Sequence, residues 1–525
     1  MSVPSQSGVT RASYSTVGSL FRARVRELPE HAAIENAAGG GRLSYRALDA
    51  RVARLAGALA AFGIQRGDRV ALLSENRPEF LEVVLAASRI GASVACQNWR
   101  LTAAELAHCI ALVSPRIVIV SERFAERIAG VEIERRLMLG VEYEELLAGA
   151  APLEADDAAE PEDALLILYT SGTTGLPKGA VLSHRAEIAR NMVVRAEFGI
   201  TTEDTFPAWS PLYHMGALEP ALGSLMAGGK VVIVDGFDAP RLAELVQKEK
   251  LGWLLLMPGM VGTFADELTR LRIEPKGVKL CGVMADLVPP ADIARITRLL
   301  EAPYANTFGA TETGCPPCSS NRIPVGVSPT RLSKQQSPFC EVRLVDPEDR
   351  EVPLGAPGEL CIRGPTLFSG YYCAPETNAQ DFRGGWFHMG DVFVRNPDGS
   401  LDFVDRVKYL IKSGGENIYP AEIERVLLQD ERVSDAAVVR RPDPKWGEVP
   451  VAFVARHTEH LEAADLYRRC RRELASYKQP KDIFFIPASE FPRSVSGKIQ
   501  RHELEKRLAA LPPRKAGGST PPDAR

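Results

Sequence analysis

The segment Tyr169-Thr-Ser-Gly-Thr-Thr-Gly-Leu-Pro-Lys178-Gly179 directly follows an apolar run at residues 164–168. The apolar run predicts a buried strand, and small hydroxyl residues and glycines after a strand let backbone N–H groups close on phosphate oxygens. The segment is not a Walker A loop, because Pro177 stands where that pattern needs Gly and Gly179 where it needs Ser or Thr. We interpret it as a phosphate-binding loop to which Lys178 adds charge; the alternative is a flexible surface loop.

Helical and strand-like patterns alternate on both sides of this loop. Apolar residues recur at helical spacing over residues 43–62 and 78–88, whereas residues 150–163, rich in Ala, Asp and Glu, predict a solvated loop. Short apolar runs that predict strands occupy residues 70–73, 92–96, 164–168, 231–234 and 254–257. Alternating strands and helices are typical of α/β architecture with a parallel sheet, so we predict a doubly wound fold for most of the first 400 or so residues.

The pattern changes after Asp405. The expected helices there are residues 421–428, 463–474 and 501–511, and paired strand-like runs occupy residues 436–439 and 449–454. These elements predict a compact α+β unit of about 100 residues. Residues 512–525, rich in Gly, Ser and Pro, predict a disordered tail.

Composition argues against two classes of protein. The 525 residues carry 63 basic and 67 acidic side chains, a formal charge of −4, so no excess of positive charge points to nucleic acid. The apolar run around Leu254 is interrupted by Pro258 and Gly259, far short of the roughly 20 residues of a membrane-spanning helix. We therefore expect neither a nucleic-acid partner nor integral membrane association.

The cysteines and the N-terminus suggest the compartment. Nine cysteines are an odd number without a framework, as expected of thiols in a reducing cytoplasm, and residues 1–16 lack the apolar core of a secretion signal. Cys315-Pro-Pro-Cys318 has the spacing of half a zinc site, but a second such pair is missing from the sequence. We predict a cytoplasmic protein and expect no metal at these cysteines.

Four further segments carry groups that suit a nucleotide. They are Asn306-Thr-Phe-Gly-Ala-Thr-Glu312, Trp386-Phe-His-Met-Gly-Asp391, Asp405-Arg-Val-Lys-Tyr-Leu-Ile-Lys-Ser-Gly-Gly-Glu-Asn417 and Pro492-Arg-Ser-Val-Ser-Gly-Lys498. The first supplies an aromatic ring, a hydroxyl and a carboxylate after a predicted strand, and Asp391 is an acceptor-only carboxylate that suits two ribose hydroxyls. Taken singly, each segment is equally typical of a turn or a solvated charge cluster.

Together, the five motifs resemble those of the acyl-adenylate-forming superfamily, which contains acyl-CoA synthetases, peptide-synthetase adenylation domains and insect luciferase. The resemblance covers residues 43–511. It implies a large multi-sheet N-terminal domain at residues 1–405 and a small mobile C-terminal lid domain at residues 406–511, joined by a hinge at residues 406–408. It also implies an ATP-dependent carboxylate–CoA ligase that forms acyl-AMP, releases pyrophosphate and transfers the acyl group to CoA.

The resemblance assigns the ATP site residue by residue. The β- and γ-phosphates are expected on Thr170, Ser171, Gly172, Thr173, Thr174, Gly175 and Lys178. Phe308 and Gly309 are expected at the adenine, where the family more often has Tyr at the position of Phe308. Thr311 is expected to reach the α-phosphate. Mg²⁺ would be held by Glu312 and Thr170, and the ribose by Asp391 and Arg406.

Three residues are assigned to catalysis: Lys498, His214 and Lys412. A carboxylate must attack the α-phosphorus of ATP, and two like unit charges ~4 Å apart repel by about 1 kcal/mol in water and roughly 4 kcal/mol at an effective dielectric constant of 20. By the resemblance, Lys498 bridges the carboxylate and the α-phosphate as charge develops. His214, in Pro211-Leu-Tyr-His-Met-Gly216, matches the histidine beside the acyl pocket.

The same resemblance implies a CoA site. After adenylation the small domain rotates at Lys408, and Lys412, Gly414 and Gly415 would line the thiol tunnel, where bare backbone leaves room for the pantetheine arm. The CoA 3′-phosphate needs basic partners, and the candidates are Arg77, Lys478 and Lys481.

The acyl pocket is expected to be mostly apolar. Its predicted lining is Trp209, His214, Met215, Ala217, Val283, Met284 and Phe308. Because no arginine is among them, the pattern favours an apolar aliphatic or aromatic monocarboxylic acid over a diacid. Gly282-Val-Met-Ala-Asp286 stands where the family usually has small residues followed by Pro. Met284 could shorten the pocket, and Asp286 could lie at the surface or recognise a polar group.

Three alternatives stay open at this point. The enzyme could stop at the adenylate or pass it to a carrier protein, although no carrier domain follows residue 511. A luciferase-type oxygenase shares the motifs. The chain could also be a nucleotide-binding scaffold without activity, although Lys178, Glu312, Asp391, Arg406 and Lys498 together argue against this. The sequence leaves a homodimer open as well.

Overall fold

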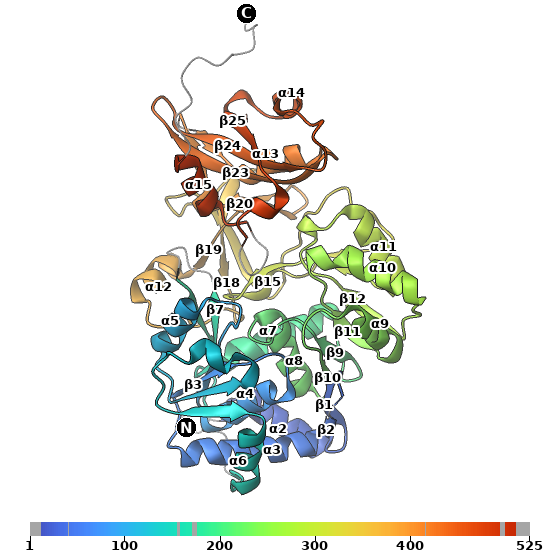
Figure 1. Ribbon diagram of the computed structural model, residues 1–525, viewed down its shortest axis with the longest axis vertical. Helices are drawn as coiled ribbons and strands as arrows, with labels where there is room; N and C mark the ends of the chain where they lie inside the picture. The colour runs from blue at the N-terminus through green and yellow to red at the C-terminus, as the bar shows by residue number, and fades with distance from the viewer. Residues whose placement is uncertain are drawn as a thin grey trace, which may run out of the picture. The chain divides into compact units, whose positions relative to one another are not determined.

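A computed structural model describes residues 12–39, 41–154, 158–170, 176–414, 416–493 and 499–510 (Figure 1). The chain divides into two compact units. Unit 1 is Met1–Val342, Cys361–His388 and Asp398–Leu401, and unit 2 is Arg343–Leu360, Met389–Pro397 and Asp402–Arg525. In the part of the chain that is described, no helix is long and apolar enough to cross a bilayer.

Unit 1 contains a six-stranded sheet in the order β6-β5-β3-β4-β7-β8. Its strands are β3 (Arg69–Leu73), β4 (Ser93–Cys96), β5 (Ile117–Ser121), β6 (Arg136–Leu139), β7 (Ala164–Thr170) and β8 (Lys178–Ser183). All neighbours are parallel except β7 and β8, which run antiparallel. The apolar runs that predicted strands in this region therefore form one mainly parallel sheet.

A second sheet of unit 1 has eight strands in the order β16-β13-β12-β11-β9-β10-β1-β2. Its strands are β1 (Ala32–Asn36), β2 (Arg42–Ser44), β9 (Thr205–Ala208), β10 (Lys230–Ile233), β11 (Leu251–Leu254), β12 (Val278–Cys281), β13 (Tyr304–Ala305) and β16 (Arg322–Ile323). The inner strands are parallel, and β2 and β16 close the edges antiparallel. The strand expected at residues 254–257 was wrong in position: β11 ends at Leu254, because the chain turns there toward the short helix η2 (Pro258–Met260).

The helices of unit 1 pack mainly on these sheets and on one another. They are α2 (Val17–Glu27), α3 (Tyr45–Ala61), α4 (Pro78–Ile90), α5 (Ala103–Val113), α6 (Val141–Gly149), α7 (His184–Phe198), α8 (Met215–Ala227), α9 (Ala239–Lys248), α10 (Val261–Leu271), α11 (Pro290–Leu300) and α12 (Pro375–Asp381). Helix α4 begins with Pro78 in its first turn and ends at Gly91, whose φ is +74°. Every residue from Phe80 to Ile90 is buried, and α4 contacts β1 of one sheet and β4 and β7 of the other. Such a helix joins the two sheets through a shared core.

Smaller elements occur in both units. Strands β14 (Phe308–Ala310) and β15 (Gly314–Cys318) form an antiparallel hairpin. A four-stranded sheet has the order β17-β18-β19-β20, with β17 (Glu341–Val345), β18 (Pro357–Arg363), β19 (Phe387–Arg395) and β20 (Leu401–Arg406). Short 3₁₀ helices are η1 (Glu122–Ile128), η3 (Ala285–Leu287), η4 (Arg383–Gly385), η5 (Val407–Tyr409), η6 (Ser476–Lys478) and η7 (Ala488–Glu490). The division between the units falls within the four strands β17 to β20.

Unit 2 is an α+β unit, as the sequence predicted. Its five-stranded sheet contains β21 (Ile411–Ser413), β22 (Glu416–Ile418), β23 (Val433–Asp443), β24 (Gly447–Arg456) and β25 (Asp482–Phe485), and its helices are α13 (Pro420–Leu428), α14 (Ala463–Glu473) and α15 (Arg501–Ala510). Alternate residues of β23 face different cores: Ala436 and Val438 pack with residues of α13 and α14, and Ala437 and Val439 pack with Leu504 of α15. This alternation is the period of a strand covered on both faces.

Gly282 is held in a conformation and a space that only glycine fits. Its φ is +75°, and a Cβ atom there would lie 2.1 Å from the ring of Tyr304, a buried residue whose hydroxyl donates to the carbonyl of Val283 at 3.2 Å. The indole Nε1 of Trp253 donates to the carbonyl of Gly282 at 2.9 Å. The turn after β12 is therefore fixed by two aromatic side chains.

We expect Gly282→Ala to lower the Tm of the protein much more than Gly236→Ala. Gly236 has a similar φ of +89° but no atom within 4 Å of an added Cβ, so its substitution should cost only the left-handed backbone, about 1 to 2 kcal/mol. Gly282→Ala adds a steric clash with Tyr304, worth about 1 to 3 kcal/mol more. Differential scanning calorimetry of both variants makes the comparison, and equal shifts of Tm would contradict it.

Candidate active site

The ends of the predicted phosphate loop are held by strand pairing. Thr170 ends β7 and Lys178 begins β8, and the two residues are paired across the antiparallel ladder. Both are half-buried. The predicted loop residues Ser171, Gly172, Thr173, Thr174 and Gly175 lie outside the described residues. The loop therefore starts and returns at one point of the sheet edge.

Tyr371 connects Lys178 with Glu312. The Nζ of Lys178 lies 5.1 Å from the centroid of the Tyr371 ring, within the range of a cation–π contact. The hydroxyl of Tyr371 donates to Oε1 of Glu312 at 2.7 Å. The backbone supports this position, because Tyr371 bridges to Ala180 of β8 and the N–H of Tyr372 donates to the carbonyl of Gly179 at 2.8 Å. Two predicted site residues that are distant in sequence thus meet on one phenol.

The β14–β15 hairpin positions Phe308, Thr311 and Glu312. Phe308 and Gly309 lie on β14, and Thr311 and Glu312 lie in the turn before β15. A Cβ atom on Gly309 would lie 1.9 Å from the carbonyl oxygen of Gly314, so glycine is required for the strands to approach. Thr313 closes the turn by accepting from the N–H of Ala310 at 3.0 Å and donating to the carbonyl of Pro316 at 2.6 Å.

The donor set around Glu312 suits Mg²⁺. Magnesium is usually bound through one or two carboxylates together with substrate phosphates and water. Glu312 is a half-buried carboxylate, and one of its oxygens is oriented by Tyr371. No cluster of three or more His, Cys, Asp or Glu side chains that could hold a metal occurs among the residues described. A cation at Glu312 would therefore take most of its ligands from phosphate and water.

In unit 2 the structure brings together the two predicted ribose ligands. Asp391 is 2% exposed, and its Oδ1 pairs with Nε of Arg406 at 2.9 Å. The adjacent Asp405 accepts from the backbone N–H of Arg406 and of Ala421, each at 2.7 Å. Burial raises the pKa of Asp405. The predicted hinge segment is thereby bonded to the first turn of α13.

The predicted hinge and tunnel residues lie on exposed backbone. Lys408, in η5, is exposed, with its Nζ 5.0 Å from the ring of Tyr409, and Lys412 is exposed on β21. Gly414 has a φ of +60°, and a Cβ there would lie 2.7 Å from the indole of Trp446, an aromatic neighbour that the sequence patterns did not indicate. Gly415 and Lys498 lie outside the described residues.

The candidate ligands of the CoA phosphate differ in their surroundings. Arg77, at the start of α4, pairs with Glu79 at 2.8 Å, and Lys478 pairs with Glu422 at 2.8 Å. Lys481 is exposed. Two of the three cations therefore already have acidic partners within their own unit.

The predicted acyl-pocket residues have different environments. His214 is exposed and caps α8, its Nδ1 accepting from the N–H of Gly216 at 3.2 Å. Trp209 is a core residue whose Nε1 donates to the carbonyl of Leu255 at 2.8 Å, and Ala217 is fully buried. Val283 and Met284 are half-buried, and Met284 has a φ of +47°, an unusual value for a non-glycine residue.

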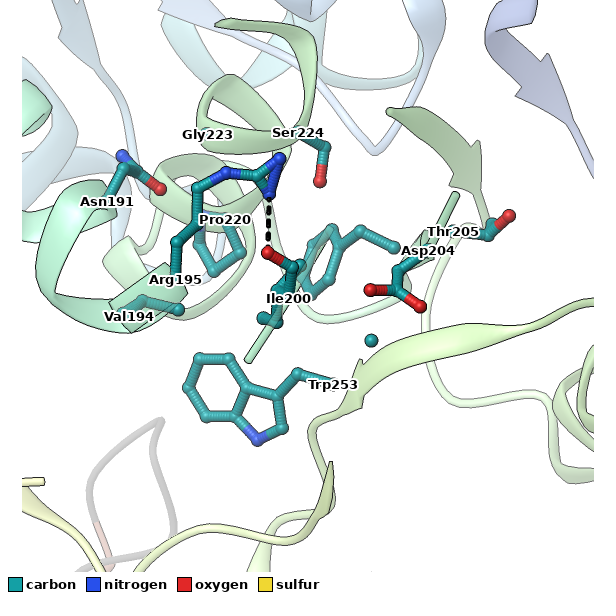
Figure 2. A pocket seen from close by; sticks show the side chains of 12 residues that line it. Asn191, Val194, Arg195, Ile200, Asp204, Thr205, Pro220, Gly223, Ser224 and Trp253 are labelled. Carbon is teal, nitrogen blue, oxygen red and sulfur yellow. Dashed lines mark hydrogen bonds between the residues drawn. The ribbon is translucent and has the colours of Figure 1, made fainter. Parts of the chain in front are cut away.

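Two small adjoining cavities, each about 20 Å³, lie against α7 and α8. Figure 2 shows the first, with Arg195 turned toward the carbonyl of Ile200, to which its Nη1 donates at 3.3 Å. The second is lined by Arg190, Asn191, Val194, Met215, Gly216, Glu219, Pro220, Trp253 and Cys315. Met215 is the one predicted acyl-pocket residue on the wall of either of these two cavities.

Comparisons with known proteins identify the family of the chain. Residues 21–372 match the family model of AMP-binding enzymes, and residues 422–498 match that of the AMP-binding enzyme C-terminal domain. The chain belongs to the AMP-binding enzyme family. A feruloyl-CoA synthase of Amycolatopsis sp is 34% identical over 505 residues, covering 92% of this chain and 97% of that protein. An indoleacetate–CoA ligase of Aromatoleum aromaticum is 32% identical over 481 residues, covering 89% and 93%.

A solved structure of a CoA synthetase supports the same family. The o-succinylbenzoate CoA synthetase of Bacillus subtilis, in complex with the acyl-adenylate intermediate OSB-AMP, has 25% identity and a TM-score of 0.81, covering 94% of this chain and 98% of that one. The expected acyl-adenylate-forming superfamily and the α/β fold class with a smaller α+β part are therefore confirmed. This AMP-binding enzyme is an acid–thiol ligase with ATP and CoA as substrates.

Asp286, whose role the sequence left open, pairs with a buried lysine. Its Oδ2 lies 2.6 Å from Nζ of Lys334, which is fully buried and also donates to Oδ1 of Asn306 at 2.7 Å. The side chain of Asp286 is 34% exposed. Asp286 and Asn306 satisfy the Lys334 ammonium and link the turn after β12 to the start of the Asn306–Glu312 motif. Sequence spacing gave no sign of Lys334, which is distant in the chain from both partners.

Helices α7 and α8 bury a second charged group. Arg190 is 1% exposed; its Nη1 donates to Oε1 of Glu219 at 2.5 Å and its Nε to the carbonyl of Thr366 at 2.8 Å. Glu187 is fully buried, and its Oε1 accepts from Nδ2 of Asn191 at 2.7 Å. The sequence analysis found no arginine among the predicted acyl-pocket residues, yet Arg190 lines the same cavity as Met215.

Burial keeps the Glu187 side chain protonated at neutral pH. Desolvation, together with the nearby Glu219 carboxylate, raises the pKa of Glu187 to about 8. Burial also raises the pKa of Glu219, but the Arg190 guanidinium opposes this shift. Because Arg190 pairs with Glu219, we infer that Glu219 is ionised and Glu187 protonated.

We expect Tyr371→Phe to reduce kcat/KM for MgATP about tenfold, because the change removes the hydrogen bond that orients Glu312 but keeps the ring beside Lys178. Acid-dependent exchange of labelled pyrophosphate into ATP measures the effect. Tyr372→Phe is the matched control, because Tyr372 is the next residue in the chain and its side chain packs against the core beside Ile167. Equal kinetics of the Tyr371→Phe variant and the wild type would contradict an orienting role.

Glu187 should make folding stability fall as the pH rises. The folded protein keeps the proton up to about pH 8, whereas the unfolded chain loses it near the ordinary pKa of 4.5, so the folded state binds more protons across this range. The Tm of the wild type relative to Glu187→Gln should therefore decrease from about pH 5 to about pH 8. Calorimetry at several pH values tests this, with Glu203→Gln as an exposed control. Parallel Tm curves for wild type and Glu187→Gln would contradict the assignment.

Proposed function

We propose that this chain activates a carboxylic acid as acyl-AMP at a site formed by Lys178, Phe308, Thr311 and Glu312, and then transfers the acyl group to CoA. The observation that carries the proposal is the meeting of Lys178 and Glu312 on Tyr371, beside the two ends of the phosphate loop. A cation and a carboxylate are there presented side by side, as the phosphates of a metal-bound nucleotide require.

Each of these side chains reduces one electrostatic repulsion in the reaction. The acid is an anion that must approach a polyanion, and a dry site strengthens this repulsion. Lys178 places positive charge on the β- and γ-phosphates, and Thr311 donates to the α-phosphate. Glu312, with Thr170, would hold Mg²⁺, which when bound neutralises charge on the departing pyrophosphate.

The ribose and the acyl carboxylate are assigned to the C-terminal part of the chain. Asp391 accepts from the ribose hydroxyls, and Arg406 holds Asp391 in place through their ion pair. Lys498 approaches the acyl carboxylate during adenylation. Rotation of residues 406–511 about a hinge at residues 406–408, with Lys408 as the turning residue, then replaces Lys498 by Lys412 and the glycines at 414 and 415 for thioester formation.

The o-succinylbenzoate named for the solved structure is a diacid, but two relatives support an aromatic monocarboxylic acid as the substrate, with an aliphatic one as the alternative. Their names specify ferulate and indoleacetate, both of which are carboxylic acids with an aromatic ring. Val283, Met284, Met215 and Trp209 supply the apolar lining that such acids need. We further propose His214 at the mouth of this pocket, basic contacts of CoA at Arg77, Lys478 and Lys481, and a cytoplasmic location. A homodimer stays a prediction.

We expect Lys498→Ala to reduce the rate of acid-dependent pyrophosphate exchange about a hundredfold or more. Removal of one group that stabilises charge in the transition state typically slows a reaction by this factor. Formation of acyl-CoA from supplied acyl-AMP should change little, since the lysine acts only in the first half-reaction. Lys506→Ala removes an exposed lysine of α15 and serves as the control. Equal loss in both half-reactions would contradict the role of Lys498, and the absence of exchange with every acid tested would contradict the proposed function.

A further inference from the structure

Arg190 lines a cavity and has one hydrogen-bond donor that no described residue uses. Its Nε and Nη1 are engaged by Thr366 and Glu219, whereas Nη2 is buried and has no hydrogen-bond partner among the residues that the structure describes. A buried, unsatisfied donor on a charged group is costly, so native proteins nearly always provide it with a partner. The second cavity, which Arg190 lines, is the place where such a partner can lie.

The cavity adjoins the predicted site of the acid. Its wall includes Met215 and Gly216, the first residues of α8 after His214, and Cys315 of β15. The stem of Arg190 packs against Gly314, because a Cβ atom on Gly314 would lie 2.9 Å from its Cδ. Gly314 is two residues from Glu312. Arg190 is thus close to the adenylation motif without being part of it.

The charge and size of this site select a particular ligand group. The positive charge of Arg190 is balanced by Glu219. Apart from the neutral amide of Asn191 and the backbone of Gly216, the remaining lining is apolar: Val194, Met215, Pro220, Trp253 and Cys315. A second carboxylate would meet the negative charge of Glu219. A volume of about 20 Å³ is enough for one water-sized group. An uncharged oxygen, such as a hydroxyl or a carbonyl, fits both conditions.

We propose that Nη2 of Arg190 donates to an uncharged oxygen at the far end of the acyl group, so that the enzyme selects carboxylic acids that carry a distal hydroxyl or carbonyl. This inference rests on the proposed function and refines its substrate class. In the absence of substrate one water molecule satisfies the same donor. An apolar acid that displaces this water leaves the guanidinium unpaired, which is the basis of the selection.

Matched pairs of acids test the proposal on the wild-type enzyme. Each pair has equal numbers of heavy atoms: an ω-hydroxy acid of butanoic-acid to decanoic-acid length and the unsubstituted acid one carbon longer, together with 4-hydroxycinnamate and 4-methylcinnamate. The readout is kcat/KM for acid-dependent pyrophosphate exchange. We expect the hydroxy acid to exceed its partner by at least about tenfold in the best pair, as one hydrogen bond to a charged donor allows. Preference for the apolar member in every pair would overturn the proposal while leaving the adenylation function intact. No exchange with any acid would overturn both.

A double variant tests whether Arg190 causes the preference for hydroxy acids. Arg190→Met alone leaves Glu219 buried without its partner, so we combine Arg190→Met with Glu219→Gln. The variant should lose about tenfold or more in kcat/KM for the preferred hydroxy acid and retain that for its apolar partner. Arg195→Met, on the same helix but lining the other cavity, is the matched control and should keep the wild-type preference. An unchanged preference in the double variant would overturn the assignment. If the double variant does not fold, as calorimetry reports, the wild-type pairs alone decide.

Discussion

Helix α4 is buried around its whole circumference, and the arrangement of unit 1 depends on that burial. The helix contacts β1 of the eight-stranded sheet and β4 and β7 of the six-stranded sheet. Its residues are mostly apolar, and its buried charges Glu82 and Arg89 are paired with Arg51 and Asp49, so the helix is stable only when packed from all sides, with the two sheets around it. Because β7 leads into the predicted phosphate loop, this packing sets where that segment begins relative to the strands that precede the Asn306–Glu312 motif.

The charged side chains of unit 1 are held in two different ways. Lys178 and Glu312 each contact the phenol of Tyr371, and in the proposed function both charges are then available to the nucleotide. Elsewhere, buried cations are matched with carboxylates: Lys334 with Asp286 and Arg190 with Glu219. Buried pairs of this kind contribute little net stability but are strongly destabilising when one partner is removed. They fix positions near the candidate site more than they strengthen the fold.

Much of the fold could be predicted because it follows from local patterns. The periodicity of residues 43–62 and 78–88 corresponds to α3 and α4, and the paired strand-like runs at residues 436–439 and 449–454 correspond to β23 and β24. The ends of a strand were harder to predict, as at β11, where the predicted strand lay too far along the chain. A continuous apolar run does not show where strand pairing stops. The motif residues were recognisable because each has a backbone or charge requirement, such as the close approach at Gly309.

Other site residues could not be predicted, because their partners are distant in the chain. Tyr371 reaches Glu312 across 59 residues, and nothing in the local pattern around Tyr371 indicates that contact. Arg190 belongs to an ordinary helical pattern, and only the packing of α7 on α8 and the approach of Gly314 enclose it. The sequence by itself determined the chemistry available: a strand followed by a predicted phosphate loop, a carboxylate after a predicted strand, and a lysine near the C-terminus. The tertiary structure alone decided which of these groups meet and which charges are buried, since desolvation and hydrogen-bond geometry depend on neighbours that residue order does not specify.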